Sequence, residues 1–331
     1  MGSSCCLRGG RRVKLATFEV STPIGTRRRI GVEHDGGLID INSAYASLLE
    51  HNSHPTPQET ADALTPPEMI GFLERGEHAL EAAKDAVEFV SNGSRVGIND
   101  SQLVFDHDEI RLLAPLPRPN SIRDFMVFEE HLANSLDGEI PEIWYEIPVY
   151  YKGNPETVVH PESEVRWPSY TEQLDYELEI AAIIGKGGIN ISAEEASEHI
   201  VGYTIFNDFS ARDIQLKEMD GQLGPTKGKD FANGFGPYLV TKDSLDIKNL
   251  HVRAKINGEV WSEGNINEMY HTFEDIVEYV SQDEPLKPGD VLGSGTVGGG
   301  CGLELDKWIS RGDTVELEAN GIGTLVHQIG T

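Results

Sequence analysis

The stretch 174–185 constrains the fold of this chain most, because it places two carboxylates at the start of an apolar run. In a β-strand, Glu177 and Glu179 point to one face about 7 Å apart, while Leu178 and Ile180 point to the other. The apolar residues that follow predict a buried strand. Buried carboxylates this close repel each other and lose hydration, so we expect a raised pKa or a bound cation. A solvated strand face is the alternative.

Bulk composition narrows the class of protein. The chain has 331 residues, of which 38% are apolar, enough for one large or two modest cores. No apolar segment is long enough to cross a bilayer. The net charge of -28 argues against nucleic acid or an anionic membrane as a partner, and it suits a salty cytoplasm, where ions screen self-repulsion. The three cysteines make no disulfide framework, which indicates a reducing, cytoplasmic location.

The expected elements divide the chain into three parts. Residues 1–13 are basic and without periodicity, so we expect a disordered tail. Residues 14–115 predict a small N-terminal α/β accessory domain, with strands at 15–20, 29–32 and 38–41, two helices at 68–75 and 78–90, and a strand at 110–113. A proline-rich connector, 114–120, follows. Residues 116–331 carry the candidate chemistry and are predicted to be the catalytic domain.

Two further acidic residues and a histidine extend the candidate site. Asp208 follows a buried strand predicted at 200–206, a natural position for a third anionic ligand. Asp124 opens a segment that reaches His131 seven residues later, beside two glutamates. His131 is either a catalytic base or a surface histidine on a charged helix. The segment 132–144 has the composition of a loop that could close over a site.

Five motifs, in order, resemble the fumarylacetoacetate hydrolase superfamily across about residues 115–331. They are Asp124-Phe125 with His131, Asp175-Tyr176-Glu177-Leu178-Glu179, the stretch 207–215, Gly228-Lys229-Asp230-Phe231 and Gly295-Thr296-Val297-Gly298. The resemblance implies an α+β, β-rich fold, with a mixed β-roll as catalytic domain, and a homodimer. It also implies a divalent cation, with Mg²⁺ favoured over Mn²⁺ or Ca²⁺, held by Asp124, Glu177, Glu179 and Asp208. Oxygen-only ligands suit such hard cations and argue against zinc.

The resemblance also implies roles for the other site residues. Members of the family cleave or rearrange small keto acids with 1,3-related carbonyls, and the metal stabilises the enolate. His131, oriented by Glu304, is the expected base, and Lys229 would add positive charge near the enolate. The remaining expected contacts to the substrate are Tyr151, Arg212, Gln215 and Thr296. Arg212 could instead brace Asp208 through an ion pair, and we favour a structural role for it.

The sequence therefore predicts a metal-dependent hydrolase that cleaves a carbon–carbon bond in a diketo or acylpyruvate-type acid, in catabolism. Asn134 favours this branch, because decarboxylase and acylpyruvase members tend to have a glutamate three residues after the histidine. The alternative is a lyase of the same family, either a 2-keto-3-deoxy sugar-acid dehydratase or an oxaloacetate-type decarboxylase or isomerase. A non-catalytic module is disfavoured, because the candidate ligands, histidine and lysine are all present.

A glycine run offers a competing hypothesis. Gly293–Gly298 fits the Gly-x-Gly-x-x-Gly fingerprint of dinucleotide-binding proteins. That fingerprint opens a helix and belongs to a β-α-β unit, whereas only about thirty residues, mostly with strand character, follow this run. We therefore expect no nucleotide site here.

Overall fold

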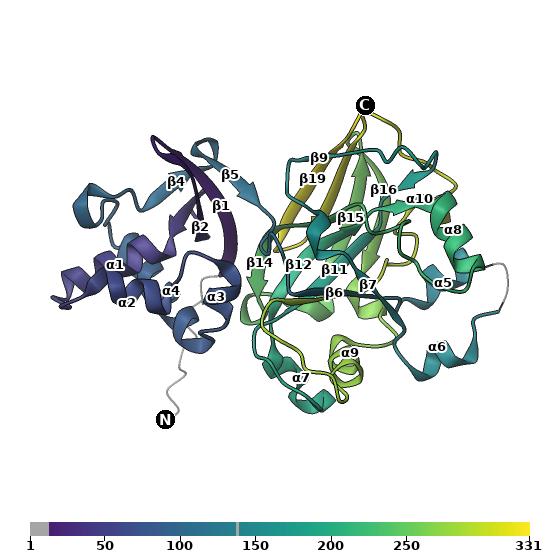
Figure 1. The fold of residues 1–331 in the computed structure, drawn as a ribbon, viewed down its shortest axis with the longest axis horizontal. Helices are drawn as coiled ribbons and strands as arrows, with labels where there is room; N and C mark the ends of the chain where they lie inside the picture. The colour runs from purple at the N-terminus through teal and green to yellow at the C-terminus, as the bar shows by residue number, and fades with distance from the viewer. Residues whose placement is uncertain (1–12, 137–138) are drawn as a thin grey trace, which may run out of the picture.

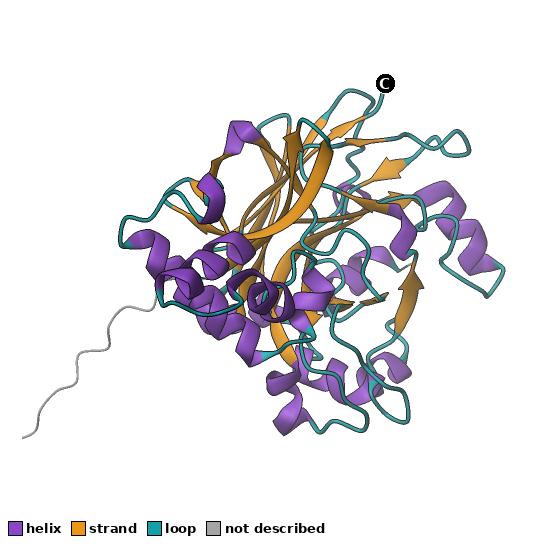
Figure 2. Cartoon of the chain, turned by 60° about the vertical axis from the view of Figure 1, so that its left-hand side comes forward, coloured by secondary structure: helices purple, strands orange, loops and turns teal. Residues whose placement is uncertain are grey.

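The computed structural model describes residues 13–136 and 139–331 (Figure 1). The fold is α+β and rich in strands, as predicted, with the strands gathered centrally and helices around them (Figure 2). Except for Val13, the tail predicted for residues 1–13 lies outside the described residues. Across the ranges described, no helix combines the length and apolar character that crossing a bilayer requires.

The N-terminal lobe, purple to blue in Figure 1, contains five strands and four α-helices over the described residues 13–115. Its strands are β1 (Lys14–Thr22), β2 (Gly25–His34), β3 (Gly37–Asp40), β4 (Val104–Asp106) and β5 (Ile110–Leu113), and its helices are α1 (Ile41–His51), α2 (Pro57–Leu64), α3 (Met69–Leu73) and α4 (Glu77–Ser91). The two predicted helices correspond to α3 and α4. The prediction of only two was wrong, because α1 and α2 precede them. The Asp40 side chain caps α1 by accepting a hydrogen bond from the Ser43 backbone N–H, which starts a helix rich in weak helix formers.

The second lobe supplies the remaining strands. They are β6 (Ser121–Phe125), β7 (Tyr150–Gly153), β8 (Val158–Val159), β9 (Glu164–Val165), β10 (Leu174–Asp175), β11 (Leu178–Ile184), β12 (Ile200–Asp208), β13 (Ser210–Ala211), β14 (Asn233–Thr241), β15 (His251–Ile256), β16 (Glu259–Asn265), β17 (Asp290–Gly293), β18 (Thr314–Ala319) and β19 (Gly323–Ile329). Most pair antiparallel, but β17 pairs with β6 in parallel, so the large sheet is mixed.

Two sheets form the centre of this lobe. The larger has the order β4-β3-β2-β1-β14-β12-β11-β17-β6-β7 and therefore runs through both lobes, and the smaller has the order β16-β15-β18-β19-β9. One buried cluster includes Ile180 and Ile205 of the large sheet with Leu317 and Leu325 of the small sheet. Burial of these faces is the main force that holds the two sheets together.

Short helices surround the sheets. They are α5 (Glu129–Ser135), α6 (Glu142–Glu146), α7 (Ala193–His199), α8 (Arg212–Asp220), α9 (Phe273–Val280) and α10 (Gly302–Leu305). The prediction of a loop over 132–144 from its composition was wrong at both ends, because α5 and α6 occupy them. Trp144 of α6 is buried and its indole N–H donates to the Met126 carbonyl at 2.6 Å, so this segment is anchored at its far end.

Candidate functional site

Neighbouring strands of the large sheet bring the predicted acidic residues together. Asp124 lies on β6, Glu179 on β11 and Asp208 at the end of β12. Strand β17 lies between β6 and β11, and its Gly293 pairs with both Asp124 and Ala181. A Cβ on Gly293 would fall 2.2 Å from Asp124 Oδ1, so the glycine leaves the room that this carboxylate needs. The glycine run thus serves packing around the acidic residues, and no β-α-β unit follows it in the part of the chain described.

The three carboxylates form a buried acidic cluster. One ligand oxygen from each of Asp124, Glu179 and Asp208 lies within 4.8 Å of the others. Asp124 Oδ1, Glu179 Oε2 and Asp208 Oδ1 are buried without a hydrogen-bond donor. Burial raises the pKa of Asp124 to about 6, and burial together with like charges raises the pKa of Glu179 and Asp208 well above the ordinary range. Converging carboxylate oxygens without donors fit a hard divalent cation, which would supply the missing positive charge.

Glu177, the fourth predicted ligand, lies beside this cluster and is ion-paired. Its carboxylate contacts Arg212 Nη1 at 2.9 Å and Lys229 Nζ at 2.5 Å. Burial alone would raise the pKa of Glu177, but the charges of Lys229 and Arg212 lower it below the ordinary value. Each carboxylate oxygen keeps a second lone pair, so these ion pairs leave Glu177 able to bind a cation as well.

Lys229 links Glu177 to the acidic cluster. Its ammonium also contacts Asp208 Oδ2 at 2.6 Å, and the Tyr151 hydroxyl donates to the same oxygen at 2.7 Å. Burial alone would lower the pKa of Lys229, but Asp208 and Glu177 raise it above its ordinary value. Lys229 is therefore a fixed positive charge at neutral pH and is unsuited to act as a base. The Thr296 hydroxyl donates to Glu179 Oε1 at 3.2 Å.

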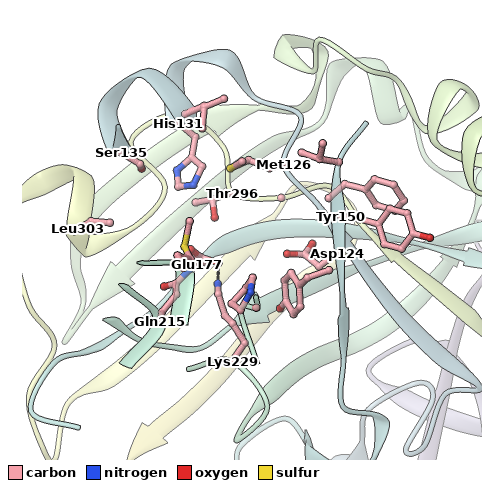
Figure 3. Close-up of a pocket in the computed structure, with 18 of the residues that line it drawn as sticks. Asp124, Met126, His131, Ser135, Tyr150, Glu177, Gln215, Lys229, Thr296 and Leu303 are labelled. Atoms are coloured by element: carbon pink, nitrogen blue, oxygen red, sulfur yellow. Dashed lines mark hydrogen bonds and ion pairs between the residues drawn. The ribbon is translucent and has the colours of Figure 1, made fainter. Parts of the chain in front are cut away.

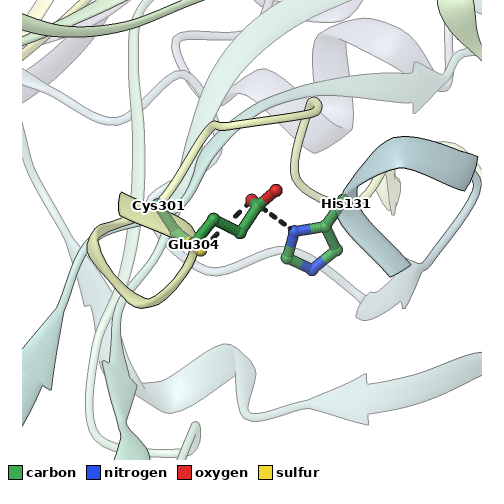
Figure 4. A group of neighbouring side chains, drawn as sticks. All are labelled: His131, Cys301 and Glu304. Atoms are coloured by element: carbon green, nitrogen blue, oxygen red, sulfur yellow. Dashed lines mark hydrogen bonds and ion pairs between the residues drawn. The ribbon is translucent and has the colours of Figure 1, made fainter. Parts of the chain in front are cut away.

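His131 and Glu304 form the expected pair, although 173 positions separate them in the chain (Figure 4). His131 Nδ1 lies 2.7 Å from Glu304 Oε1. Three more donors reach the same carboxylate, from Asn134 Nδ2 at 3.0 Å, the Gly299 backbone N–H at 2.8 Å and Cys301 Sγ at 3.4 Å. Burial would raise the pKa of Glu304, but the hydrogen bond and charge of His131, with the other donors, lower it. A charged Glu304 keeps the proton on His131 Nδ1 and leaves Nε2 as an acceptor.

Asn134 and Cys301 were not predicted as partners of Glu304. The sequence signalled Asn134 only as a departure from the family pattern, and Cys301 only as one member of a glycine-rich segment. One ligand atom from each of His131, Cys301 and Glu304 also lies within 4.8 Å of the others, close enough to surround a metal ion. Their ligand atoms already contact one another through hydrogen bonds, so these three residues need no cation.

Asp175 is a further residue whose role the sequence did not reveal. The Arg212 guanidinium lies 2.7 Å from Asp175 Oδ2 and is buried. The Asp175 carboxylate also accepts hydrogen bonds from the backbone N–H groups of Gly302, at 2.8 Å, and Leu303, at 3.0 Å. Arg212 therefore braces Asp175 and Glu177, in keeping with the structural role favoured above, although its partner is not Asp208. Gln215 Oε1 accepts a hydrogen bond from Arg212 Nη1 at 3.0 Å.

A cavity of about 300 Å³ lies over these groups (Figure 3). All of the predicted site residues line it except Asp208 and Glu304, which lie behind Lys229 and His131. In Figure 3 the His131 ring points into the cavity from one side, and Lys229 and Glu177 face it from the other. The described residues thus combine a candidate metal site, a fixed cation and a histidine base around one space.

Comparisons with known proteins agree with this geometry. The family model described as fumarylacetoacetate (FAA) hydrolase C-terminal matches residues 120–330. A mitochondrial oxaloacetate tautomerase of Xenopus laevis is 30% identical, over 96% of this chain and 90% of its own. An oxaloacetate tautomerase of Bacillus subtilis is 32% identical, over 89% of this chain and 94% of its own. The solved fumarylacetoacetate hydrolase from psychrophilic Exiguobacterium antarcticum is 26% identical, with a TM-score of 0.70 over 96% of this chain and 99% of its own.

Proposed function

Because this chain belongs to the fumarylacetoacetate hydrolase family, we propose that it is a divalent-metal-dependent enzyme that interconverts the keto and enol forms of a 2-keto acid that shares the keto-acid end of oxaloacetate. The observation that carries the proposal is the acidic cluster, two of whose carboxylates, those of Asp124 and Glu179, line one cavity with Lys229 and His131. The relatives named as oxaloacetate tautomerases favour this reaction over the carbon–carbon hydrolysis that the sequence favoured. The proposal therefore follows the isomerase alternative.

Tautomerisation needs a proton to move between C3 and the C2 oxygen. A bound hard cation would polarise the keto oxygen and stabilise the enolate. His131 Nε2, facing the cavity, accepts the C3 proton, and Glu304 stabilises the imidazolium that forms. Lys229 holds positive charge close to the developing enolate. The His131 imidazolium then gives its Nε2 proton to the C2 oxygen, so no bond between carbon atoms breaks.

The test follows enol loss from oxaloacetate by ultraviolet absorbance. The protein is first treated with a chelator and then supplied with Mg²⁺, Mn²⁺ or Ca²⁺, and we expect activity only with a cation. His131→Gln should lower kcat at least about 100-fold. The control is His251→Gln, because His251 is exposed on β15, away from the cavity. Full activity without metal, or in His131→Gln, would contradict this mechanism.

Carbon–carbon hydrolysis is the second candidate, and one observation favours it. Three other donors hold the Glu304 carboxylate against His131, an arrangement that also suits a base that activates water. Product analysis separates the candidates. Cleavage of an acylpyruvate into two acids supports the hydrolase, release of carbon dioxide supports a decarboxylase, loss of water from a sugar acid supports a dehydratase, and an unchanged carbon skeleton supports the tautomerase.

Assembly and location belong to the same proposal. We propose a homodimer and a cytoplasmic location. Light scattering coupled to gel filtration would measure the assembled mass, and a value near twice the 36.4 kDa of one chain would support the dimer.

A further inference from the structure

The mouth of the cavity differs in chemistry from its floor. Arg212, Leu216 and Met219 lie at spacings of four and three on α8, so they share one face of that helix, and all three line the cavity. Arg212 is 3% exposed, whereas Leu216 and Met219 are 52% and 49% exposed. Helix α8 therefore runs from the charged floor to the solvent, and it presents two large apolar side chains where a long substrate would end.

Other walls near this opening are apolar as well. Leu132 and Leu136, from and just after α5, line the cavity, as do Met126 and Val149. Among the described residues that line it, Lys229 and Arg212 are the only ones with ammonium or guanidinium groups. Both are buried at the floor and paired with carboxylates. The described residues at the mouth thus provide no ammonium or guanidinium group to neutralise a carboxylate at the far end of a substrate.

The size of the cavity also favours a substrate that is longer than a four-carbon acid. Its volume of about 300 Å³ lies at the lower end of the range for pockets that hold drug-sized ligands. A four-carbon acid seated at the metal would leave the apolar mouth filled with water. An apolar group attached to the keto acid would instead displace that water and bury Leu216 and Met219.

We propose that Leu216 and Met219 form an apolar subsite, and that this enzyme prefers 2-keto acids whose remote end is uncharged and apolar over dicarboxylates. The inference rests on the proposed function, because the keto-acid group must sit at the metal for the remote end to reach this subsite. It assigns α8 a part in substrate choice that is separate from the chemistry at the floor.

Binding of N-substituted oxamates tests the subsite without turnover. These compounds carry the adjacent carbonyl and carboxylate of a 2-keto acid but have no C3 proton to remove. Calorimetry with the Mg²⁺-loaded protein would compare N-methyl, N-carboxymethyl and N-phenyl oxamate. We expect the phenyl compound to bind about tenfold more tightly than either of the others, the gain typical of a small apolar group entering an apolar pocket.

Charged substitutions at the subsite provide the second arm. Leu216→Asp and Met219→Asp should bring the phenyl-to-methyl affinity ratio close to one. The matched control is Leu223→Asp, because Leu223 is 84% exposed just after α8 and does not line the cavity. This control should keep the tenfold ratio. Thermal melts would verify that all three variants fold.

The outcomes separate the two proposals. Equal affinities for the three compounds, or tighter binding of the carboxymethyl compound, would overturn the subsite and leave the tautomerase proposal standing. A retained preference for the phenyl compound in a protein that tautomerises no 2-keto acid would support the subsite and refute the proposed function. An unchanged ratio in both aspartate variants would show that Leu216 and Met219 do not form the subsite.

Discussion

Glu177 and Glu179 have identical side chains two residues apart, but their pKa values shift in opposite directions. Glu177 contacts Arg212 and Lys229, and these charges lower its pKa. Glu179 is fully buried, has no ion pair among the described residues and faces Asp124, so its pKa is raised. Arg212 and Lys229 therefore stabilise the charged form of Glu177. The charged form of Glu179 lacks such a partner and could be stabilised by a cation bound from solvent.

Glu179→Gln should separate metal binding from folding. The native state of the metal-free protein favours a protonated Glu179, so stability is lost as the pH rises through the ordinary carboxyl pKa. Glutamine removes this loss, and we expect the metal-free variant to gain roughly 1 kcal/mol near neutral pH. Mg²⁺ affinity should fall at least about tenfold. Chemical denaturation in a chelator and calorimetry with Mg²⁺ measure the two effects.

Glu172→Gln is the control for this change, because Glu172 is exposed on the same stretch of chain and lies outside the acidic cluster. It should alter neither quantity. A Glu179→Gln protein that is less stable without metal and binds Mg²⁺ normally would contradict the assignment of Glu179 as a ligand.

His327 predicts a pH dependence of stability that does not involve the active site. It lies on β19, is fully buried against Phe209, and neither ring nitrogen has a hydrogen-bond partner. Burial lowers its pKa to about 4, below the value of about 6.5 for an unfolded chain. The native state therefore favours the neutral ring, and stability is lost as the pH falls below about 6.5. Between about pH 8 and about pH 5.5 the loss from this residue should be about 1.4 kcal/mol.

Denaturant melts of His327→Leu across this range should show a shallower pH dependence by that amount. The same substitution at His251, which is exposed, should leave the slope of the wild-type protein unchanged. Equal slopes for His327→Leu and the wild type would mean that water reaches the His327 ring.

For the individual site residues, the sequence predicted which acidic side chains lie together but not all of the hydrogen bonds around them. Asp124, Glu179 and Asp208 were predicted to meet because each belongs to a motif that the sequence shows directly, and the strands of the large sheet bring them together. The roles of Asp175 and Asn134 depend on distances across 127 to 170 positions of the chain, which no local pattern encodes.

At the scale of elements, Asp175 joins three parts of the site. It lies at the end of β10, pairs with Arg212 at the start of α8, and accepts the hydrogen bonds of the first backbone N–H groups of α10. Helix α10 carries Glu304, so Asp175 fixes the position of the His131 partner. A carboxylate suits the N-terminus of a helix because the free N–H groups there carry partial positive charge.

Asp175→Asn should weaken this junction. It removes a buried negative charge and leaves Arg212 with one ion pair fewer, which should cost about 3–5 kcal/mol of unfolding free energy. Because α10 shifts with it, kcat should fall as well, even though Asp175 does not line the cavity. Denaturation and steady-state kinetics measure both losses. Glu198→Gln, at an exposed ion pair with Lys186, is the control and should change neither. Normal stability in Asp175→Asn would show that the junction does not depend on this charge.

The elements that sequence patterns described best are the apolar strands. The predicted acidic strand became β11, but it begins at Leu178, and Glu177 forms only an isolated bridge with Cys301. Helices α5 and α6 were missed because seven and five residues are too few to establish a helical period. Tertiary contacts stabilise them, such as the hydrogen bond from Trp144 to Met126.

At the scale of the molecule, the two lobes share a sheet and a core. Strand β1 pairs with β14, with Leu15 opposite Leu239. One buried cluster includes Leu15 and Ile30 from the N-terminal lobe with Phe206 and Phe235 from the second. The domain boundary predicted at residues 115 and 116 separates a part of the chain without candidate site residues from the part that carries all of them. The shared cluster indicates that unfolding of one lobe would expose apolar surface of the other.

We therefore expect the two lobes to unfold together. All four tryptophans, Trp144, Trp167, Trp261 and Trp308, belong to the second lobe, so their fluorescence reports on that lobe alone. Leu15→Ala removes apolar contacts from the shared cluster, and its cost of about 2–5 kcal/mol should appear in full as a lower denaturation midpoint of tryptophan fluorescence. The matched control is Val96→Ala, also in the N-terminal lobe, because Val96 is 63% exposed. A Leu15→Ala protein whose tryptophan midpoint equals that of Val96→Ala would show that the lobes unfold independently, and that the common sheet transmits little stability between them.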